Sequence, residues 1–340
     1  MVALNLKISY RTLTARLSLP ARYRDAALFV LLAVLFGCAF VAIETGLREL
    51  PPLLFASLRF DIAAVALLGY VVFAYPRSAW LPRTRNDVLA VGVAGVFLVV
   101  LNNALLFVGQ GYTTPAMASI MYGLNPILAP VFAWWLLGDR LSLPGVLGIG
   151  VALAGVVVIV QPSQAALLDA GAVGQVLVLG AAAAIAIGSV LLERLQPRIG
   201  SLPLTAWAMA LGAVLLHGVS LAAGESPTSV VGVGRLTVVS LLVVGIPSTA
   251  VAYAVHLGLL ERIGSVRANL VAYVVPIVAA VTGWVLLGAG LSGRSVVGFL
   301  VVVAGFGLIE RHTLRQELCR IRHRTGRRDP TPEGRHPCDD

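Results

Sequence analysis

The chain has 340 residues, of which 58% are hydrophobic and only 12% are charged, with a mean hydropathy of +0.91 and a formal net charge of +9. An average soluble domain carries about 25% charged residues, so this composition excludes an ordinary soluble globular protein and favours a membrane protein. The three cysteines, one in an apolar stretch and two in a charged tail, exclude a disulfide-based scaffold.

Ten apolar segments follow one another along the chain, each close to the ~20 residues needed to cross ~30 Å of hydrocarbon. A basic arm, 1–25, precedes them and lacks the pattern of a signal peptide. A charged tail, 311–340, follows them and is expected to stay disordered. In chain order the predicted spans are 26–46, 52–74, 87–109, 114–137, 143–161, 173–192, 203–223, 236–257, 263–287 and 292–310.

Lysine and arginine are distributed unequally between the links, which predicts the orientation. With the N-terminus in the cytoplasm, 21 of the 25 Lys and Arg lie on the cytoplasmic side, three on the outer side (Arg48, Arg235 and Arg294) and one, Arg59, inside a span. This split predicts a multi-pass protein of the cytoplasmic or inner membrane with both termini in the cytoplasm. Orientation and attraction to anionic lipid headgroups explain the net charge, so no nucleic acid is required.

One stretch of the sequence occurs twice. Residues 126–159, moved forward by 150 positions, align with 276–309 without a gap, and 16 of the 34 positions are identical. Because some identities fall on scarce residue types, chance similarity between two apolar stretches does not account for the match. These identities are Pro126/Pro276 and Trp134/Trp284. The chain is therefore predicted to be a duplication.

The two predicted repeats, 26–161 and 173–310, contain five spans each. Five is an odd number, so the second repeat must enter the membrane upside down. Inverted repeats are a common plan of secondary transporters, which bind substrate near the midplane where the repeats meet. The predicted fold is an all-α membrane protein with ten transmembrane helices in two inverted five-helix repeats. Glycines of the fifth and tenth spans predict close helix packing: Gly145, Gly148, Gly150, Gly155, Gly298, Gly305 and Gly307.

Several motifs carry a family resemblance. They are Phe36-Gly37-Cys38-Ala39-Phe40-Val41-Ala42-Ile43, Leu50-Pro51-Pro52, Ser57-Leu58-Arg59-Phe60 and Leu137-Gly138-Asp139-Arg140-Leu141-Ser142. Over about 26–310 the chain resembles the drug/metabolite transporter superfamily, in its EamA-type branch. The resemblance implies ten helices in two inverted halves and export of small metabolites, amino acids or drug-like compounds. The chain departs from the family pattern at Phe36 (usually Trp), at Glu44 (often basic) and at Ala289, where the first repeat has Asp139.

Three ionisable side chains in the first two spans are candidates for substrate binding or ion coupling. Arg59 lies roughly 10 Å into its span, where a charge costs at least ~2.5 kcal/mol. It is interpreted as an anchor for an anionic group, as a partner of Glu44, or as a structural arginine. Glu44, near the outer end of the first span, is a candidate cation or proton site, or an interfacial residue. Asp61 points away from Arg59, so it has another partner or titrates as a proton carrier.

Prolines and polar side chains in four other spans form the second candidate group. Pro126 and Pro276 are expected to kink their helices, because proline removes a backbone donor. Interrupted helices at matching places mark the binding sites of transporters. The candidate substrate-binding residues are Asn103, Tyr122, Asn125, Tyr253, Asn269 and Tyr273. The alternatives are kinks that serve packing alone and polar groups that bond only between helices. His217, in the seventh span, has no predicted partner.

Motifs for energy coupling and catalysis are absent from the sequence. It contains no Walker-type phosphate loop, no His-Glu-x-x-His, no Gly-x-Ser-x-Gly and no cysteine-rich metal pattern, so no cofactor and no metal are expected. The leading hypothesis is a secondary active transporter, not an enzyme, that works by alternating access around a midplane cavity. The alternatives are an intramembrane enzyme and a non-transporting scaffold or sensor. The expected partners are a small-molecule substrate and the bilayer, with protons as a candidate coupling ion and a homodimer as a candidate assembly.

Overall fold

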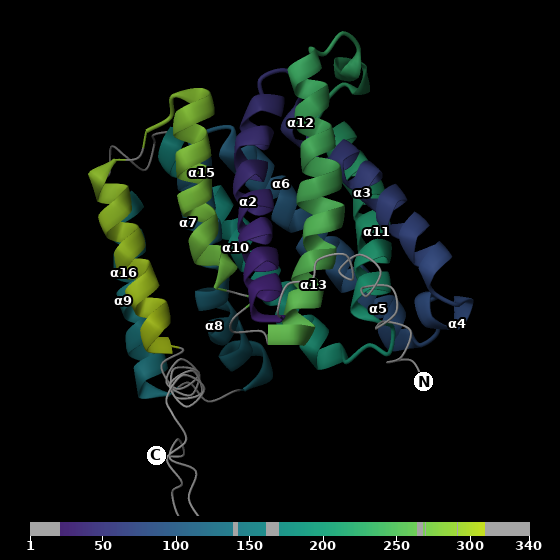
Figure 1. Ribbon diagram of the computed structural model, residues 1–340, viewed down its shortest axis with the longest axis horizontal. Helices are drawn as coiled ribbons and strands as arrows, with labels where there is room; N and C mark the ends of the chain where they lie inside the picture. Colours follow the sequence, from purple (N-terminus) through teal and green to yellow (C-terminus); the bar gives the residue numbers. More distant parts are fainter. Residues whose placement is uncertain are drawn as a thin grey trace, which may run out of the picture.

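The computed structural model describes residues 21–138, 142–160, 170–263, 268, 270–290 and 292–309. Every regular element within these ranges is a helix, and the longer helices stand side by side in one bundle (Figure 1). The predicted tail and residues 1–20 of the predicted arm lie outside the described residues. The fold class is therefore all-α, as the composition and the long apolar segments predicted.

The N-terminal part of the bundle begins with two long helices and then becomes segmented. Its elements, in order, are α2 (Ala21–Gly46), α3 (Pro52–Ala74), the short α4 (Arg77–Trp80), α5 (Arg85–Val93), the π-helix η1 (Ala94–Leu101), α6 (Asn102–Gln110), α7 (Pro115–Tyr122), α8 (Asn125–Leu137) and α9 (Leu143–Val160). The segments α5, η1 and α6 follow one another without a break and together form the third predicted span.

The C-terminal part repeats this order of long and segmented helices. Its elements are α10 (Ala170–Leu195), α11 (Ser201–Ala222), the 3-10 helix η3 (Pro227–Val230), α12 (Arg235–Gly245), the π-helix η4 (Ile246–Val251), α13 (Ala252–Ile263), α15 (Val271–Leu287) and α16 (Gly293–Ile309). Here α12, η4 and α13 are continuous and form the eighth predicted span.

Seven helical stretches are long and apolar enough to cross a membrane, and three further apolar helices are shorter. The seven are Tyr23–Gly46, Pro52–Ala74, Arg85–Gln110, Pro115–Leu137, Gly171–Leu195, Ser201–Ala222 and Arg235–Leu259. The shorter three are Leu143–Ile159, Val271–Leu287 and Gly293–Ile309. Each of the ten predicted segments thus contains an apolar helix.

Two segments differ from their predicted form. The fourth is interrupted rather than merely kinked, because α7 ends at Tyr122 and α8 begins at Asn125. Pro126 lies in the first turn of α8, where its missing N–H costs no helical hydrogen bond. In the ninth, α15 begins only at Val271, and Pro276 lies inside it.

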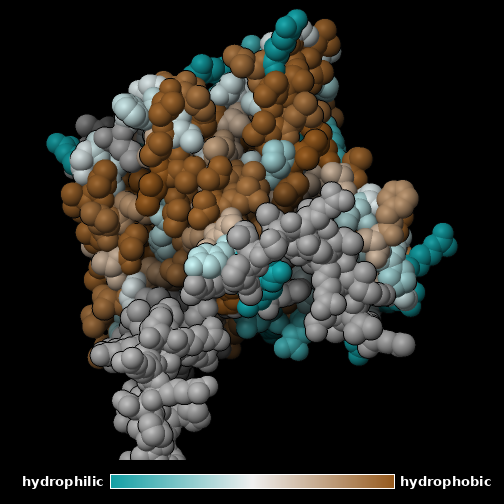
Figure 2. All heavy atoms as spheres, in the orientation of Figure 1, coloured by the Kyte–Doolittle hydropathy of each residue, from teal (hydrophilic) through white to brown (hydrophobic). Residues whose placement is uncertain are grey.

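The surface of the bundle is apolar over its middle. Figure 2 shows hydrophobic residues covering most of this face, with hydrophilic ones at its upper and lower margins. Large apolar side chains stand fully outward, such as Phe73 (93% exposed) and Trp135 (70%). Soluble monomers rarely expose contiguous apolar patches of this extent, so lipid is the natural covering of the surface.

The two π-helical segments lie at matching positions, since their last residues, Leu101 and Val251, are 150 apart. A π-turn leaves backbone carbonyls out of the usual α-helical pattern. η1 packs against α11, and η4 packs against α3. A Cβ on Gly95 would lie 3.0 Å from Leu211 of α11, and one on Gly245 would lie 2.9 Å from Ile62 of α3. Both glycines therefore permit close approach at these crossings.

Helices α9 and α16 pack through their glycines, as predicted. A Cβ on Gly148 would lie 2.6 Å from the carbonyl oxygen of Gly305, and one on Gly155 would lie 2.8 Å from that of Gly298. A shift of 150 residues turns the first contact into the second. Gly150, on another face of α9, has open space around it.

Carboxylates tie helix ends together across the sequence. Asp87 accepts hydrogen bonds from the backbone N–H groups of Arg83, Thr84, Arg198 and Ile199. Glu49 accepts from the Gly234 N–H at 2.7 Å and from the Thr237 hydroxyl at 2.6 Å. These bonds, first that of Thr237, hold the pKa of Glu49 below its usual value. A shift of 150 residues relates the pair Asp87–Ile199 to the pair Thr237–Glu49.

Candidate functional site

Arg59 of α3 is a buried cation, with only 7% of the residue exposed. Its Nε donates to the Thr249 hydroxyl at 2.7 Å, and its Nη1 donates to the Asn103 side-chain oxygen at 3.1 Å. The guanidinium carbon lies 4.9 Å from the ring centroid of Phe60 and 5.5 Å from that of Phe107, within cation–π range. Neutral groups and aromatic faces therefore hold this cation.

The charge of Arg59 has no acidic partner in the described part of the chain. The ion pairs found there are Asp61–His217 and Asp25–Arg262, so the predicted pair of Arg59 with Glu44 does not form. A guanidinium carries five N–H donors. Nη2 has no hydrogen-bond partner among the described residues, which leaves donors for a carboxylate or phosphate.

The two π-helical segments orient the partners of Arg59. The Thr249 hydroxyl donates to the Val244 carbonyl oxygen at 2.6 Å. The Asn103 side-chain amide donates to the carbonyl oxygens of Val99 at 2.8 Å and Leu98 at 3.2 Å. These bonds use carbonyls of the π-helical stretches, and they turn the free lone pairs of Thr249 and Asn103 toward the guanidinium. Arg59 is thus bound to η4 and α6 at once.

Two tyrosines complete the group, which we call the Arg59 cluster: Arg59, Asn103, Tyr122, Thr249 and Tyr253. Tyr122 and Tyr253 both interact electrostatically with the guanidinium. Three predicted substrate-binding candidates, Asn103, Tyr122 and Tyr253, therefore converge on Arg59.

Neighbouring polar and aromatic groups fix both tyrosines. Tyr122 exchanges long hydrogen bonds with Asn102, at 3.3 and 3.4 Å, and Asn102 donates to the Ala181 carbonyl oxygen at 2.9 Å. Tyr253 packs edge-to-face on Phe36, with ring centroids 6.2 Å apart. The cluster is thereby connected to α2 and α10 as well.

The other candidates lie elsewhere. Asn125 is half-buried at the start of α8, and Tyr273, in α15, packs its ring on Phe306 with centroids 4.6 Å apart. Glu44 is half-buried on α2. Asn269 lies outside the described residues. Asp61 accepts a hydrogen bond from His217 of α11 at 2.7 Å, so the expectation that Asp61 has a partner other than Arg59 is confirmed.

Sequence reasoning missed Thr249 and the partnership of His217. Thr249 belongs to the run Pro247-Ser248-Thr249, which is unusually polar for an apolar span and was the available signal. The Asp61–His217 contact joins residues 156 apart, and nothing in the sequence places α3 beside α11. Among the described residues there is no group of three or more His, Cys, Asp or Glu side chains that could hold a metal ion.

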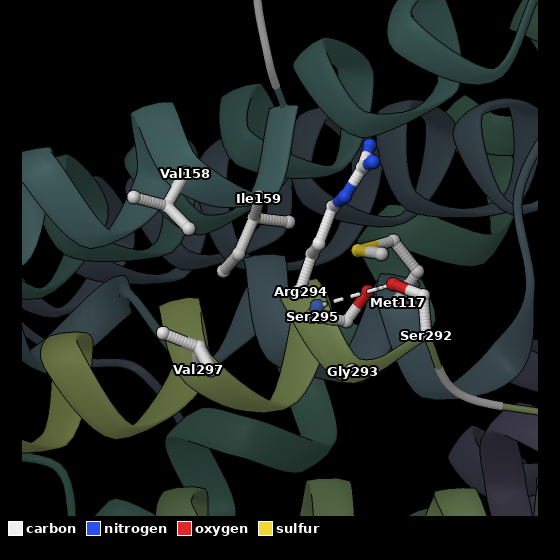
Figure 3. Close-up of a pocket in the computed structure, with 8 residues that line it drawn as sticks. All are labelled: Met117, Val158, Ile159, Ser292, Gly293, Arg294, Ser295 and Val297. Atoms are coloured by element: carbon white, nitrogen blue, oxygen red, sulfur yellow. Dashed lines mark hydrogen bonds between the residues drawn. The ribbon is translucent and has the colours of Figure 1, made fainter.

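A cavity of about 600 Å³ opens between α7, α9 and α16. Its wall is mostly apolar, and Arg294 stands between Ile159 and Met117 (Figure 3). Ser292 and Ser295 bond to each other at the start of α16. None of the predicted site residues lines this cavity, so it is separate from the Arg59 cluster.

A lipid-covered helical bundle that keeps a cation and several polar groups in its interior belongs to the class of membrane transport proteins. The model of the EamA-like transporter family matches residues 25–161 and 172–311. The chain belongs to the EamA-like transporter family, within the drug/metabolite transporter superfamily, as its motifs predicted. It is a multi-pass membrane transporter.

Relatives are similar over most of their length. An "uncharacterized transporter" of Archaeoglobus fulgidus is 31% identical over 81% of this chain and 95% of its own. A "probable amino-acid metabolite efflux pump" of Salmonella typhimurium is 27% identical over 86% and 98%. An "uncharacterized inner membrane transporter", YedA of Escherichia coli, is 28% identical over 79% and 83%. A protein crystal structure shares the fold, with a TM-score of 0.60 and 21% identity over 87% and 99%.

Proposed function

We propose that this protein is a secondary active transporter that exports small metabolites, amino acids among them, and that Arg59 binds an anionic group of the substrate. The observation that carries the proposal is the buried guanidinium with spare donors and no carboxylate partner in the described part of the chain. A buried charge of this kind in a membrane protein usually marks a substrate pathway. A carboxylate matches the guanidinium in charge and in planar, bidentate geometry.

The proposed architecture is ten spans in two inverted repeats, 26–161 and 173–310, with the arm 1–25, the tail 311–340 and both termini in the cytoplasm. Contacts related by the 150-residue shift support it: the two π-helices, the glycine contacts of α9 with α16, and the carboxylate contacts of Glu49 and Asp87. Such contacts arise when two similar halves pack around a twofold axis, as inverted-repeat transporters do.

The Arg59 cluster lies where these two halves meet. Arg59 and Asn103 come from the first repeat and Thr249 from the second, so a relative movement of the repeats alters the hydrogen bonds of the guanidinium. In the proposed mechanism of alternating access, Asn103, Tyr122 and Tyr253 bind the polar part of the substrate beside Arg59. Asn125, Asn269 and Tyr273 contact it along the pathway, and Pro126 and Pro276 serve as hinges. Glu44 and Asp61 are the proposed charge or coupling residues.

The direction and the substrate class rest on relatives. The Salmonella relative is named as an amino-acid metabolite efflux pump, and an amino-acid metabolite carries the carboxylate that Arg59 would bind. Family and relatives alike are transporters, in keeping with a protein that is not an enzyme.

Substrate counterflow in proteoliposomes tests the proposal. Vesicles loaded with each unlabelled member of an amino-acid and metabolite panel are diluted into the labelled compound. A transporter produces a transient overshoot of label with its substrates, and carboxylate-bearing compounds should dominate. No overshoot with any compound would favour a scaffold or sensor, and turnover of a lipid or peptide without solute movement would favour an enzyme.

A further inference from the structure

Asp61 and His217 form an ion pair outside the Arg59 cluster. His217 Nε2 lies 2.7 Å from Asp61 Oδ2, joining α3 to α11. Arg59 lies two residues earlier on α3, and its guanidinium points the other way, to Thr249 and Asn103. The same helix therefore carries the proposed substrate anchor on one face and a titratable pair on another.

The pair lies within the apolar zone. Asp61 is nine residues after Pro52, about 14 Å along α3, and His217 is five residues before Ala222, about 8 Å from the end of α11. The side chains are 45% and 39% exposed. Around them the surface is lipid-facing, as the exposure of Val65 (75%) and Val214 (69%) indicates. A carboxylate in this setting is costly unless a cation compensates it.

We infer that Asp61 and His217 together form the proton-binding site that drives transport, an inference that rests on the proposed transport function. Without its proton the pair is a neutral imidazole donating through Nε2–H to a carboxylate, with a net charge of −1. Uptake of one proton from water at His217 Nδ1 gives an imidazolium–carboxylate pair with no net charge. Low dielectric surroundings favour the second form, and the two groups titrate as a unit.

Other titratable groups on the packed elements are occupied or distant. On α3, Tyr70 lies nine residues beyond Asp61. On α5, Asp87 binds the backbone before the opposite end of α11, the end near Arg77 and Arg85. On α13, Arg262 pairs with Asp25, and His256 packs on Phe36. Arg235 begins α12. In the described contacts, the charge compensating Asp61 is that of His217.

Proton and substrate are linked through α3. An anionic substrate at Arg59 adds negative charge across the helix, which favours the protonated, neutral form of the pair. By reciprocity the protonated pair strengthens substrate binding by the same factor. For charges about 10 Å apart at an effective dielectric constant near 20, this factor is about tenfold. Substrate affinity should therefore rise as the pH falls.

The test compares D61N and H217Q with wild type and with E193Q, which removes an exposed carboxylate of α10. Proteoliposomes are assayed for counterflow of radiolabelled amino acids at equal pH, and for accumulation of the same compounds driven by an imposed pH gradient. Counterflow needs no proton movement, so both variants should keep it within about threefold of wild type. Accumulation should fall at least tenfold in both variants and remain in E193Q. The exchange D61H/H217D restores the pair and should recover accumulation.

Each result decides between the two proposals. Accumulation retained by both D61N and H217Q would overturn the proton site and leave the transporter intact. Absence of wild-type counterflow would overturn the transport function, and the proton site with it. If neither single variant can be purified folded, gradient-driven accumulation by D61H/H217D supports the site, and its loss with counterflow preserved overturns it.

Discussion

Replacing Arg59 by glutamine separates a substrate anchor from a structural arginine. In R59Q the shorter side chain retains an amide donor for the Asn103 oxygen but loses the positive charge and the donors proposed for substrate. R59K keeps the charge, though as a compact ammonium rather than a planar fork. The two variants therefore remove charge and geometry separately.

The expected magnitude follows from the hydrogen bonds at stake. A hydrogen bond to a charged group contributes about 1.5–3 kcal/mol, and each 1.4 kcal/mol changes an affinity tenfold. R59Q should therefore weaken the apparent affinity for a carboxylate-bearing substrate about 10- to 150-fold, and R59K should weaken it less. The folded protein loses less than this, because the Thr249 hydroxyl keeps its bond to the Val244 carbonyl oxygen.

The measurement is the substrate concentration for half-maximal counterflow, with thermal unfolding of each purified variant as the check on folding. R198Q, which removes an exposed arginine, is the matched control and should behave as wild type. The reasoning would be refuted if R59Q transported with unchanged half-saturation. A loss of stability in T249V as large as that in R59Q, with affinity unchanged in both, would assign Arg59 to structure.

Three further predictions concern stability, each measured by thermal unfolding. G148A should lower the unfolding temperature, because its Cβ would lie 2.6 Å from the Gly305 carbonyl oxygen and overpacking costs about 1–3 kcal/mol. G150A, with open space, should not, and equal effects would contradict the packing. D87N should cost about 1.5–3 kcal/mol, since one amide oxygen cannot accept on both sides of the carboxylate; a neutral effect would remove Asp87 as a tie to α11. E49Q should be less stable than wild type at neutral pH. Because the folded-state pKa of Glu49 lies below the usual 4.5, that difference should shrink as the pH falls through it, and a constant difference would show that its charge is irrelevant.

The helical segments and the buried cation were predictable because each leaves a local trace. A span must bury about 20 residues in hydrocarbon, and the ten apolar segments report that length directly. Arg59 was recognisable because an arginine within such a segment is expensive and therefore rare. The tyrosines and Asn103 were found by their polarity and, for Asn103 and Tyr253, by the 150-residue spacing.

What the sequence concealed depends on tertiary contacts and on helix register. A threonine in an apolar span usually bonds its own backbone, so Thr249 gave no sign that it also accepts from Arg59. The break before Pro126 was predicted only as a kink, because proline is equally suited to the first turn of a new helix. The pairing of Asp61 with His217 needs the adjacency of α3 and α11, which no local pattern encodes.

The π-helical segments η1 and η4 have a consequence for how this protein tolerates change in chain length. Each residue advances an α-helix by about 100°, so the surplus residue of a π-turn offsets the phase of everything beyond it. Deleting one residue within Ile246–Val251 would restore a regular helix and rotate one flank of the span by about a quarter-turn. Thr249 and Tyr253 would then no longer both face Arg59. In these two segments the number of residues is as constrained as their identity, and a single-residue gap there should be far more damaging than a substitution.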